Sequence, residues 1–340
     1  MINEIRDVLT NNDLLIVYTW DADNLMAASI ITSYVLNTGP GRLGYLAHED
    51  FKPGVSFIGD IAKTSRQYDS VILLGPGWQG PEIDLLAANI HGEVVVIDNS
   101  WNYIRPRMKN VLYFNPSPRG DSRGNWPTVS FLVHMITRSE YYLEIAASII
   151  AMMGHGAISS RIYQNMMVKA GLHHILDKSI PLECSNKLWG ITVSQNPLSF
   201  KDIPRSLVES GYDICMALMK DPLVSSYEVL ASEIVNEVLK SRRKEYDSVR
   251  LVESDLPRNY STLLLTSRIL LRSPVKKVVT AAKVSSGYRF CAWSLAKRPI
   301  ASIVGDLRRR NAKAKGVYQG QINYVCGEDL SKSIIERVLS

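Results

Sequence analysis

Residues 14–24 read Leu14-Leu15-Ile16-Val17-Tyr18-Thr19-Trp20-Asp21-Ala22-Asp23-Asn24, an apolar run that ends in two carboxylates one residue apart. The apolar part has the length and composition of a buried strand, which would place both carboxylates at the edge of a sheet. Carboxylates delivered to a sheet edge are a common means of holding a divalent cation. The end of this first predicted strand is therefore the candidate metal site of the chain.

Length and composition indicate an ordinary globular protein. The chain has 340 residues, enough for two domains with cores, of which 46% are hydrophobic and 21% charged. No segment reaches the roughly 18 apolar residues of a membrane span, and residues 1–13 lack the apolar core of a signal peptide. We expect a cytoplasmic protein without membrane contact. The cysteines form no C-x-x-C pair, which favours free thiols over a zinc site: Cys184, Cys215, Cys291 and Cys326.

Apolar runs and helical patterns alternate through the first half. Continuous apolar runs separated by helices are typical of a parallel sheet that is covered on both faces. Two helices are predicted, Leu25–Leu36 with Asp23 or Asn24 as its N-cap, and Glu82–Ile90. The predicted strands are Leu14–Tyr18, Ser56–Gly59, Val71–Leu74, Val94–Ile97 and Val111–Phe114.

The second half divides into a helical part and a strand-rich part. Residues 128–167 read as mostly helical, and a later helix follows the capping-box pattern Ser225-Ser226-Tyr227-Glu228. The last hundred residues change to strands at 278–284, 288–293 and 321–326, with helices at 299–310 and 330–339. The predicted domains are a parallel-sheet domain at 1–170, a helical linker at 171–245 and a smaller α/β domain at 246–340.

Positive charge is concentrated in two clusters, although the net charge is only +6. One cluster runs from Lys240 to Lys244. The other cluster lies at residues 308–315. Each cluster is either a solvated face or a set of phosphate contacts, and the cluster at 308–315 supplies the candidate nucleic-acid-binding residues. These are Arg308, Arg309, Arg310, Lys313 and Lys315.

Ligands of an open parallel sheet bind beyond the carboxyl ends of its strands, so the residues that follow the strands matter most. Asp21 and Asp23 follow the first strand, and Gly75, Asp98 and Asn115 follow later ones. Asp60 either caps a helix or adds a carboxylate at this edge. Four tryptophans near the edge either stack nucleic-acid bases or fill the cleft with packed rings: Trp20, Trp78, Trp101 and Trp126.

The order of these strand ends resembles the motif order of the DHH phosphoesterases, the RecJ superfamily. Asp21-Ala22-Asp23-Asn24 stands where the family has Asp-x-Asp-Gly, and Asp98-Asn99-Ser100 stands where it has Asp-His-His. The last hundred residues are similar in position and length to the family's substrate-binding module, the DHHA1 domain. The resemblance implies a parallel-sheet DHH-like domain followed by a smaller α/β domain.

Each motif of the family is altered in this chain. The resemblance implies that active members bind two manganese ions, yet Gly75 replaces the second-motif aspartate, and Asn99 and Ser100 replace both histidines. The residual ligand candidates could hold one Mg²⁺ with waters but not a bridged Mn²⁺ pair: Asp21, Asp23 and Asp98. We therefore expect no catalytic residue, no metal and no cofactor.

A RecJ-like chain without its metal ligands is similar to the non-catalytic branch that accompanies the replicative helicase, the group of cell division control protein forty-five, in its shorter archaeal form. The resemblance implies a nucleoid-associated protein that bridges the GINS complex and the MCM helicase. The two basic clusters are compatible with contact to single-stranded DNA. One alternative is a Mn²⁺- or Mg²⁺-dependent single-strand exonuclease or small-nucleotide phosphoesterase. Another is a DNA-binding module without replisome partners.

Overall fold

The computed structural model describes the first half of the chain most fully. The described residues are 1–39, 41–48, 55–99, 104–116, 128–138, 187, 190–191, 203–209, 222–240, 243–246, 249–254, 277–284, 287–294, 306–307, 309, 313–319 and 322–330. Within them, no helix is both long enough and apolar enough to cross a membrane.

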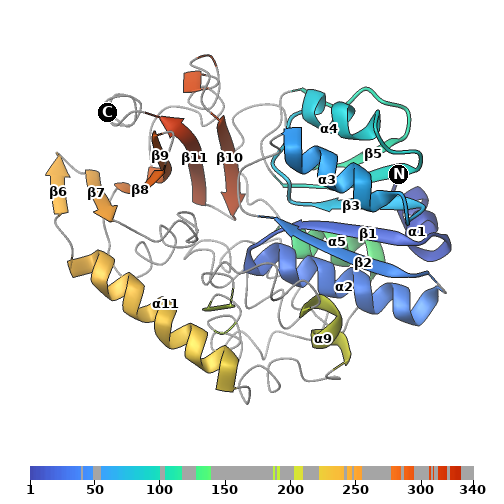
Figure 1. Cartoon of the computed structure of the whole chain (residues 1–340), viewed down its shortest axis with the longest axis horizontal. Helices are drawn as coiled ribbons and strands as arrows, with labels where there is room; N and C mark the ends of the chain where they lie inside the picture. The colour runs from blue at the N-terminus through green and yellow to red at the C-terminus, as the bar shows by residue number, and fades with distance from the viewer. Residues whose placement is uncertain are drawn as a thin grey trace.

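A five-stranded parallel sheet forms the first half (Figure 1). Its spatial order is β2-β1-β3-β4-β5, and every neighbouring pair is parallel. The strands are β1 (Leu14–Thr19), β2 (Leu43–His48), β3 (Ser70–Leu74), β4 (Glu93–Ile97) and β5 (Val111–Phe114). The predicted parallel α/β sheet is confirmed, because four of its strands are the continuous apolar runs of the sequence.

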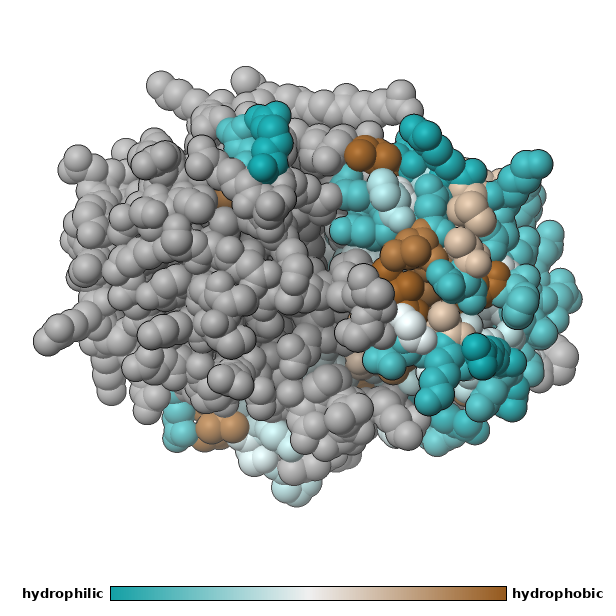
Figure 2. All heavy atoms as spheres, turned by 45° about the horizontal axis from the view of Figure 1, so that its top comes forward, coloured by the Kyte–Doolittle hydropathy of each residue, from teal (hydrophilic) through white to brown (hydrophobic). Residues whose placement is uncertain are grey.

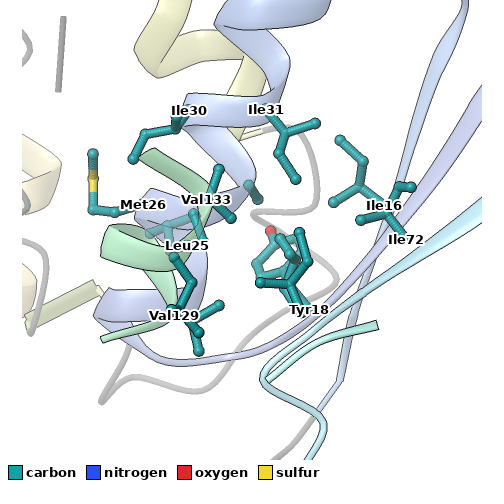
Figure 3. Close-up of a cluster of buried hydrophobic side chains, with 14 of the residues drawn as sticks. Ile16, Tyr18, Leu25, Met26, Ile30, Ile31, Ile72, Val129 and Val133 are labelled. Atoms are coloured by element: carbon teal, nitrogen blue, oxygen red, sulfur yellow. The ribbon is translucent and has the colours of Figure 1, made fainter. Parts of the chain in front are cut away.

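Helices cover both faces of this sheet. Alternate residues of a strand lie on opposite faces, so Ile16 and Tyr18 pack in one hydrophobic cluster while Leu15 and Val17 pack in the other. The first cluster includes side chains of α1, α2 and α5, and Figure 3 shows how those of α2 and α5 meet the strands. The second includes side chains of α3 and α4. The helices are α1 (Ile2–Asn11), α2 (Ala22–Thr38), α3 (Val55–Ser65), α4 (Gly80–Ala87) and α5 (Val129–Thr137).

Two strand predictions in this half were wrong. The apolar run at 56–59 belongs to helix α3, because its buried residues Ile58 and Ile61 are three positions apart and lie on one helix face. Strand β2 was missed because it is an edge strand, half-buried from Leu43 to Ala47, and carries Gly44 and His48 in place of a continuous apolar run.

Two predicted helix starts also differ. Helix α2 begins at Ala22, so its N-cap is Asp21 and not Asp23 or Asn24. Helix α11 (Pro222–Lys240) begins before the supposed capping box. Its Ser225 and Glu228 instead bind the buried amino group of Lys187, at 3.0 Å and 2.8 Å. Residues three apart on a helix face have the same spacing as a capping box, which explains the error.

The second half contains a separate six-stranded mixed sheet. Its order is β10-β11-β9-β8-β7-β6, and only the β7–β8 pair is parallel. The predicted strands at 278–284 and 288–293 are confirmed as a hairpin, and the one predicted at 321–326 is confirmed from Ile322 onward. The elements are α9 (Ile203–Glu209), β6 (Arg243–Tyr246), β7 (Val249–Ser254), β8 (Lys277–Val284), β9 (Gly287–Ser294), β10 (Lys313–Gln319) and β11 (Ile322–Leu330).

Several predictions fall partly or wholly outside the described residues. Of the helix expected at 128–167, only α5 is described. Of the one expected at 299–310, Asp306, Leu307 and Arg309 are helical. Leu330 ends strand β11, so it does not begin the expected terminal helix, whose remaining residues lie outside the described part. The division at 170 and 245 stays a prediction.

The described surface is largely hydrophilic on the face shown in Figure 2, with one hydrophobic patch near the middle of the coloured area and smaller hydrophobic spots elsewhere. The large hydrophobic side chains that are exposed in the described residues are few and belong to several elements: Met1, Leu36, Leu85, Met108, Met135, Val229 and Leu230. Scattered exposed apolar residues of this kind are normal for a globular protein.

Candidate functional site

The carboxyl ends of the parallel strands are joined into one edge by hydrogen bonds. Thr19 Oγ1 donates to the Gly75 carbonyl oxygen at 3.0 Å. The Gly75 amide donates to the carbonyl oxygen of Ile97 at 2.9 Å, and the Asp98 amide donates to that of Phe114 at 3.1 Å. Gly75 and Asp98 therefore lie along one edge with the end of β1, as the parallel topology predicts, but the described residues Asp21, Asp23 and Asp98 do not form a group that could hold a metal ion.

Asp21 serves as the N-cap of helix α2. Its Oδ1 accepts a hydrogen bond from the Asn24 backbone amide at 2.8 Å, and its Oδ2 accepts one from Asn24 Nδ2 at 2.7 Å. A carboxylate at this position satisfies an otherwise unpaired amide of the first turn and interacts favourably with the helix dipole. Asp21 is half-buried, so this first candidate ligand already has a structural role.

Asp23 holds the start of another helix, α5. Its Oδ2 accepts a hydrogen bond from the Val129 amide at 2.7 Å, and its Oδ1 accepts one from the Ser130 amide at 2.9 Å. Ser130 Oγ adds a third bond to Oδ1 at 2.5 Å. Both carboxylate oxygens are thus occupied by the first turn of α5, a contact that we term the Asp23 clasp.

Burial dominates the electrostatics of Asp23. The side chain is only 4% exposed, and loss of water raises the pKa of its carboxyl group above the ordinary value. The hydrogen bonds from Ser130 and Val129 favour the carboxylate and lower the pKa in part. The clasp therefore offsets some of the cost of burying this group.

Asn24 and Gly75 occupy the space between the first two strand ends. Gly75 has a φ of +55°, a backbone conformation that favours glycine. A Cβ atom at this position would lie 2.3 Å from Asn24 Oδ1 and 2.5 Å from Asn24 Nδ2. Asn24 is itself 5% exposed. The amide of Asn24 thus fills the volume that any side chain of residue 75 would need.

Asp98 and Asn99 directly follow the carboxyl end of β4. Asp98 is fully buried and Asn99 is 6% exposed, while Ser100 lies outside the described residues. Trp20 and Trp78 are 1% and 2% exposed and belong to the two hydrophobic clusters. Of the two interpretations of these rings, packing is confirmed for Trp20 and Trp78, whereas Trp101 and Trp126 lie outside the described part.

The donor set does not fit a pair of manganese ions. Among the residues that the structure describes, no group of three or more His, Cys, Asp or Glu side chains could hold a metal ion. Both oxygens of Asp23 are bound by α5, and Gly75 offers no ligand. Asp60, the other candidate carboxylate, lies exposed inside α3 and does not cap it. We therefore derive no reaction step through a metal.

Parts of the two basic clusters lie on the two edge strands of the second sheet. Lys313 and Lys315 belong to the edge strand β10, and the other edge strand, β6, contains Arg243 and Lys244. Lysine on an edge strand also discourages pairing with other chains, which is a purely structural explanation. Arg309 is exposed and forms an ion pair with Asp306. The other candidates, Arg308 and Arg310, lie outside the described residues.

Two features of this site were not predicted from the sequence: the partner of Asp23 and the role of Asn24. The partner of Asp23 was missed because Ser130 is 107 residues away along the chain. The filling role of Asn24 was missed because the residue reads as a possible helix cap. The positive φ of Gly75 is hinted at by the breaker Gly75-Pro76-Gly77, whose two glycines both adopt this conformation.

No protein-family model and no curated protein matches the sequence. Solved structures do match. Exonuclease RecJ bound to manganese superposes with a TM-score of 0.57 at 14% identity, covering 99% of this chain and 93% of that one. The chain has the RecJ fold. A second RecJ structure, from Thermus thermophilus and in complex with Mn²⁺, gives 0.53 at 16% identity and covers 99% of this chain and 52% of that one.

The RecJ fold is what these low identities establish, and it agrees with the DHH-like domain order expected from the sequence. CDC45 from Entamoeba histolytica matches less well, with a TM-score of 0.46 at 8% identity over 99% of this chain and 97% of that one. The fold assignment therefore rests on the two RecJ structures, which have the higher TM-scores.

Proposed function

We propose that this chain is a non-catalytic protein of RecJ fold that acts in DNA replication, where it associates with GINS and the MCM helicase and contacts single-stranded DNA. The observation that carries the loss of catalysis is the Asp23 clasp. Two-metal hydrolysis needs carboxylates free to bind both ions, since the ions activate the attacking water and stabilise the leaving oxygen. In this chain both oxygens of Asp23 accept hydrogen bonds from α5.

The exchange at positions 24 and 75 supports the same conclusion. In the family pattern that the sequence resembles, the first of these positions is glycine and the second is aspartate. In this chain the larger residue, Asn24, occupies the first position and glycine occupies the second. Asn24 fills the space beside Gly75. The Asn24 amide also donates to Asp21 Oδ2, so a neutral donor satisfies an oxygen that a cation would otherwise bind. The filling of this space by the Asn24 amide supports a site that holds no metal pair.

A nuclease assay tests the loss of catalysis. The purified chain is incubated with Mn²⁺ or Mg²⁺ and 5′-labelled single strands, with an active RecJ as the positive control. We expect no mononucleotides from this chain and no difference between it and an Asp21→Ala variant. Mononucleotide release that Asp21→Ala abolishes would support the alternative, a metal-dependent exonuclease or small-nucleotide phosphoesterase.

Metal occupancy gives a second readout that does not depend on finding the right substrate. Isothermal titration of the metal-free chain with Mn²⁺ should show no tight binding, and Asp98→Asn should leave the titration unchanged. Two tightly bound ions per chain, lost in the Asp98→Asn variant, would contradict the proposal.

The replisome partners rest on the sequence resemblance and need a direct test. The tagged chain is purified from its native source at near-native salt, and the bound proteins are identified by mass spectrometry. Subunits of GINS and of the MCM helicase are expected. Recovery of DNA without these subunits would favour the remaining alternative, a plain DNA-binding module.

A further inference from the structure

Two cysteines that are far apart in the sequence occupy one register position in the second sheet. Strands β9 and β11 are antiparallel neighbours, visible side by side in Figure 1, and Cys291 is paired directly with Cys326. The pairing is part of a continuous ladder, because Val325 pairs with Ala292 on one side and Gly327 with Phe290 on the other. The topology therefore brings together two thiol-bearing residues that the sequence pattern left unconnected.

The backbone geometry of such a pair is compatible with a disulfide. Directly opposite residues in an antiparallel ladder have Cα atoms about 4.5 Å or about 5.5 Å apart, depending on the hydrogen-bonding position. Disulfides span Cα separations of about 4.4 to 6.8 Å. Residues at paired positions also lie on the same face of the sheet. Either kind of position thus allows the bond without rearrangement of the strands.

We propose that Cys291 and Cys326 form a redox-sensitive dithiol that closes to a disulfide when a low-molecular-weight disulfide is available as the oxidant. The thiolate of one cysteine attacks the oxidant, forms a mixed disulfide and releases one small thiol. The thiolate of the second cysteine then attacks the mixed disulfide at the protein sulfur and releases the other small thiol. Two electrons pass from the cysteine pair to the oxidant, and both protein thiol protons are lost.

A disulfide between Cys291 and Cys326 would also affect the residues that lie between them in the sequence. The part of the chain between Cys291 and Cys326 includes the five predicted nucleic-acid-binding residues. We term them the basic segment: Arg308, Arg309, Arg310, Lys313 and Lys315. A disulfide would therefore close a covalent loop around the predicted nucleic-acid-binding residues. It would also restrict the unfolded chain, so the oxidised protein should unfold at a higher temperature than the reduced one.

Thiol mapping tests the proposal on the full chain. The reduced protein is treated with oxidised glutathione, the remaining thiols are alkylated, and non-reduced peptides are identified by mass spectrometry. We expect loss of two of the four thiols and one cross-linked peptide that joins Cys291 to Cys326. Cross-links to Cys184 or Cys215, separate glutathione adducts on Cys291 and Cys326, or four unreacted thiols would each overturn it.

A register variant provides the matched control. In Cys326→Ser/Gly327→Cys the thiol moves one position along β11, to the opposite face of the sheet. This variant should keep four thiols but yield glutathione adducts in place of the internal cross-link, and its melting temperature should not rise on oxidation. An internal cross-link of equal yield in this variant would contradict the role of the register.

Discussion

At the scale of single residues, the carboxylate of Asp23 is a structural anchor. It accepts three hydrogen bonds from the first turn of α5. The sequence was sufficient to place Asp21, Asp23 and Asp98 at strand ends, because apolar runs and parallel topology determine that edge. It could not reveal what Asp23 binds, because the donors on α5 lie more than a hundred residues away, whereas the partner of Asp21 is the nearby Asn24.

Replacing Asp23 with asparagine should weaken this anchor. The amide group of Asp23→Asn would present a donor to the backbone amides of α5 and lose at least one buried hydrogen bond. We expect the free energy of unfolding to fall by about 1 to 3 kcal/mol, measured by urea denaturation. The control is Asp60→Asn, an exposed position on α3, which should change it by less than about 0.5 kcal/mol. Equal stabilities of the two variants would contradict the clasp.

Asn24 and Gly75 should be energetically coupled. Gly75→Ala places a Cβ atom against the Asn24 amide and imposes strain at a positive φ, so it should destabilise the fold. In the background of Asn24→Ala the contact is gone and only the strain remains. A double-mutant cycle should therefore give a favourable coupling of about 0.5 to 3 kcal/mol. Strict additivity would show that Asn24 does not fill this space.

At the scale of secondary-structure elements, the helix α3 replaces a strand that the sequence suggested. Gly59 lies exposed within this helix, and a Cβ atom there would meet nothing within 4 Å. Because glycine weakens helix interiors, Gly59→Ala should raise the free energy of unfolding by about 0.5 to 1 kcal/mol. The same substitution at Gly75 should have the opposite sign. A destabilising effect at position 59 would argue against the helix.

The elements that the sequence predicted well are those whose burial leaves a local pattern. Strands β1, β3 and β4 are apolar runs because both of their faces are covered. Strand β2 leaves no such run because Gly44 and His48 interrupt its apolar residues, whereas the other edge strand, β5, is the continuous run Val111–Phe114. The helix at 55–65 was misread because its first apolar residues are adjacent in sequence, and only tertiary packing selects the helical spacing of Ile58 and Ile61.

At the scale of the whole molecule, the proposed contact with single-stranded DNA can be tested at the basic segment, Arg308 to Lys315. Each lysine that contacts a phosphate of a single strand contributes about 0.7 to the slope of log K against log salt concentration. The double variant Lys313→Gln/Lys315→Gln should therefore reduce that slope by about 1.4, as measured by fluorescence anisotropy with a labelled oligonucleotide. The control Lys63→Gln/Lys109→Gln removes the same charge from exposed positions of the first half and should leave the slope unchanged.

The Asp23 clasp also bears on the order in which the polypeptide takes shape during translation. Helix α5 supplies the donors for Asp23 and the buried residues Val129, Leu132, Val133 and Ile136. A growing chain that includes all five parallel strands but not α5 lacks the hydrogen-bond donors for Asp23. Its hydrophobic residues on α2 that pack against α5 are still uncovered. Native contacts of such long sequence separation form slowly. We therefore infer that the amino-terminal half becomes stable only after residue 137 has left the ribosome, so that a nascent chain paused before that point would be a target for chaperones.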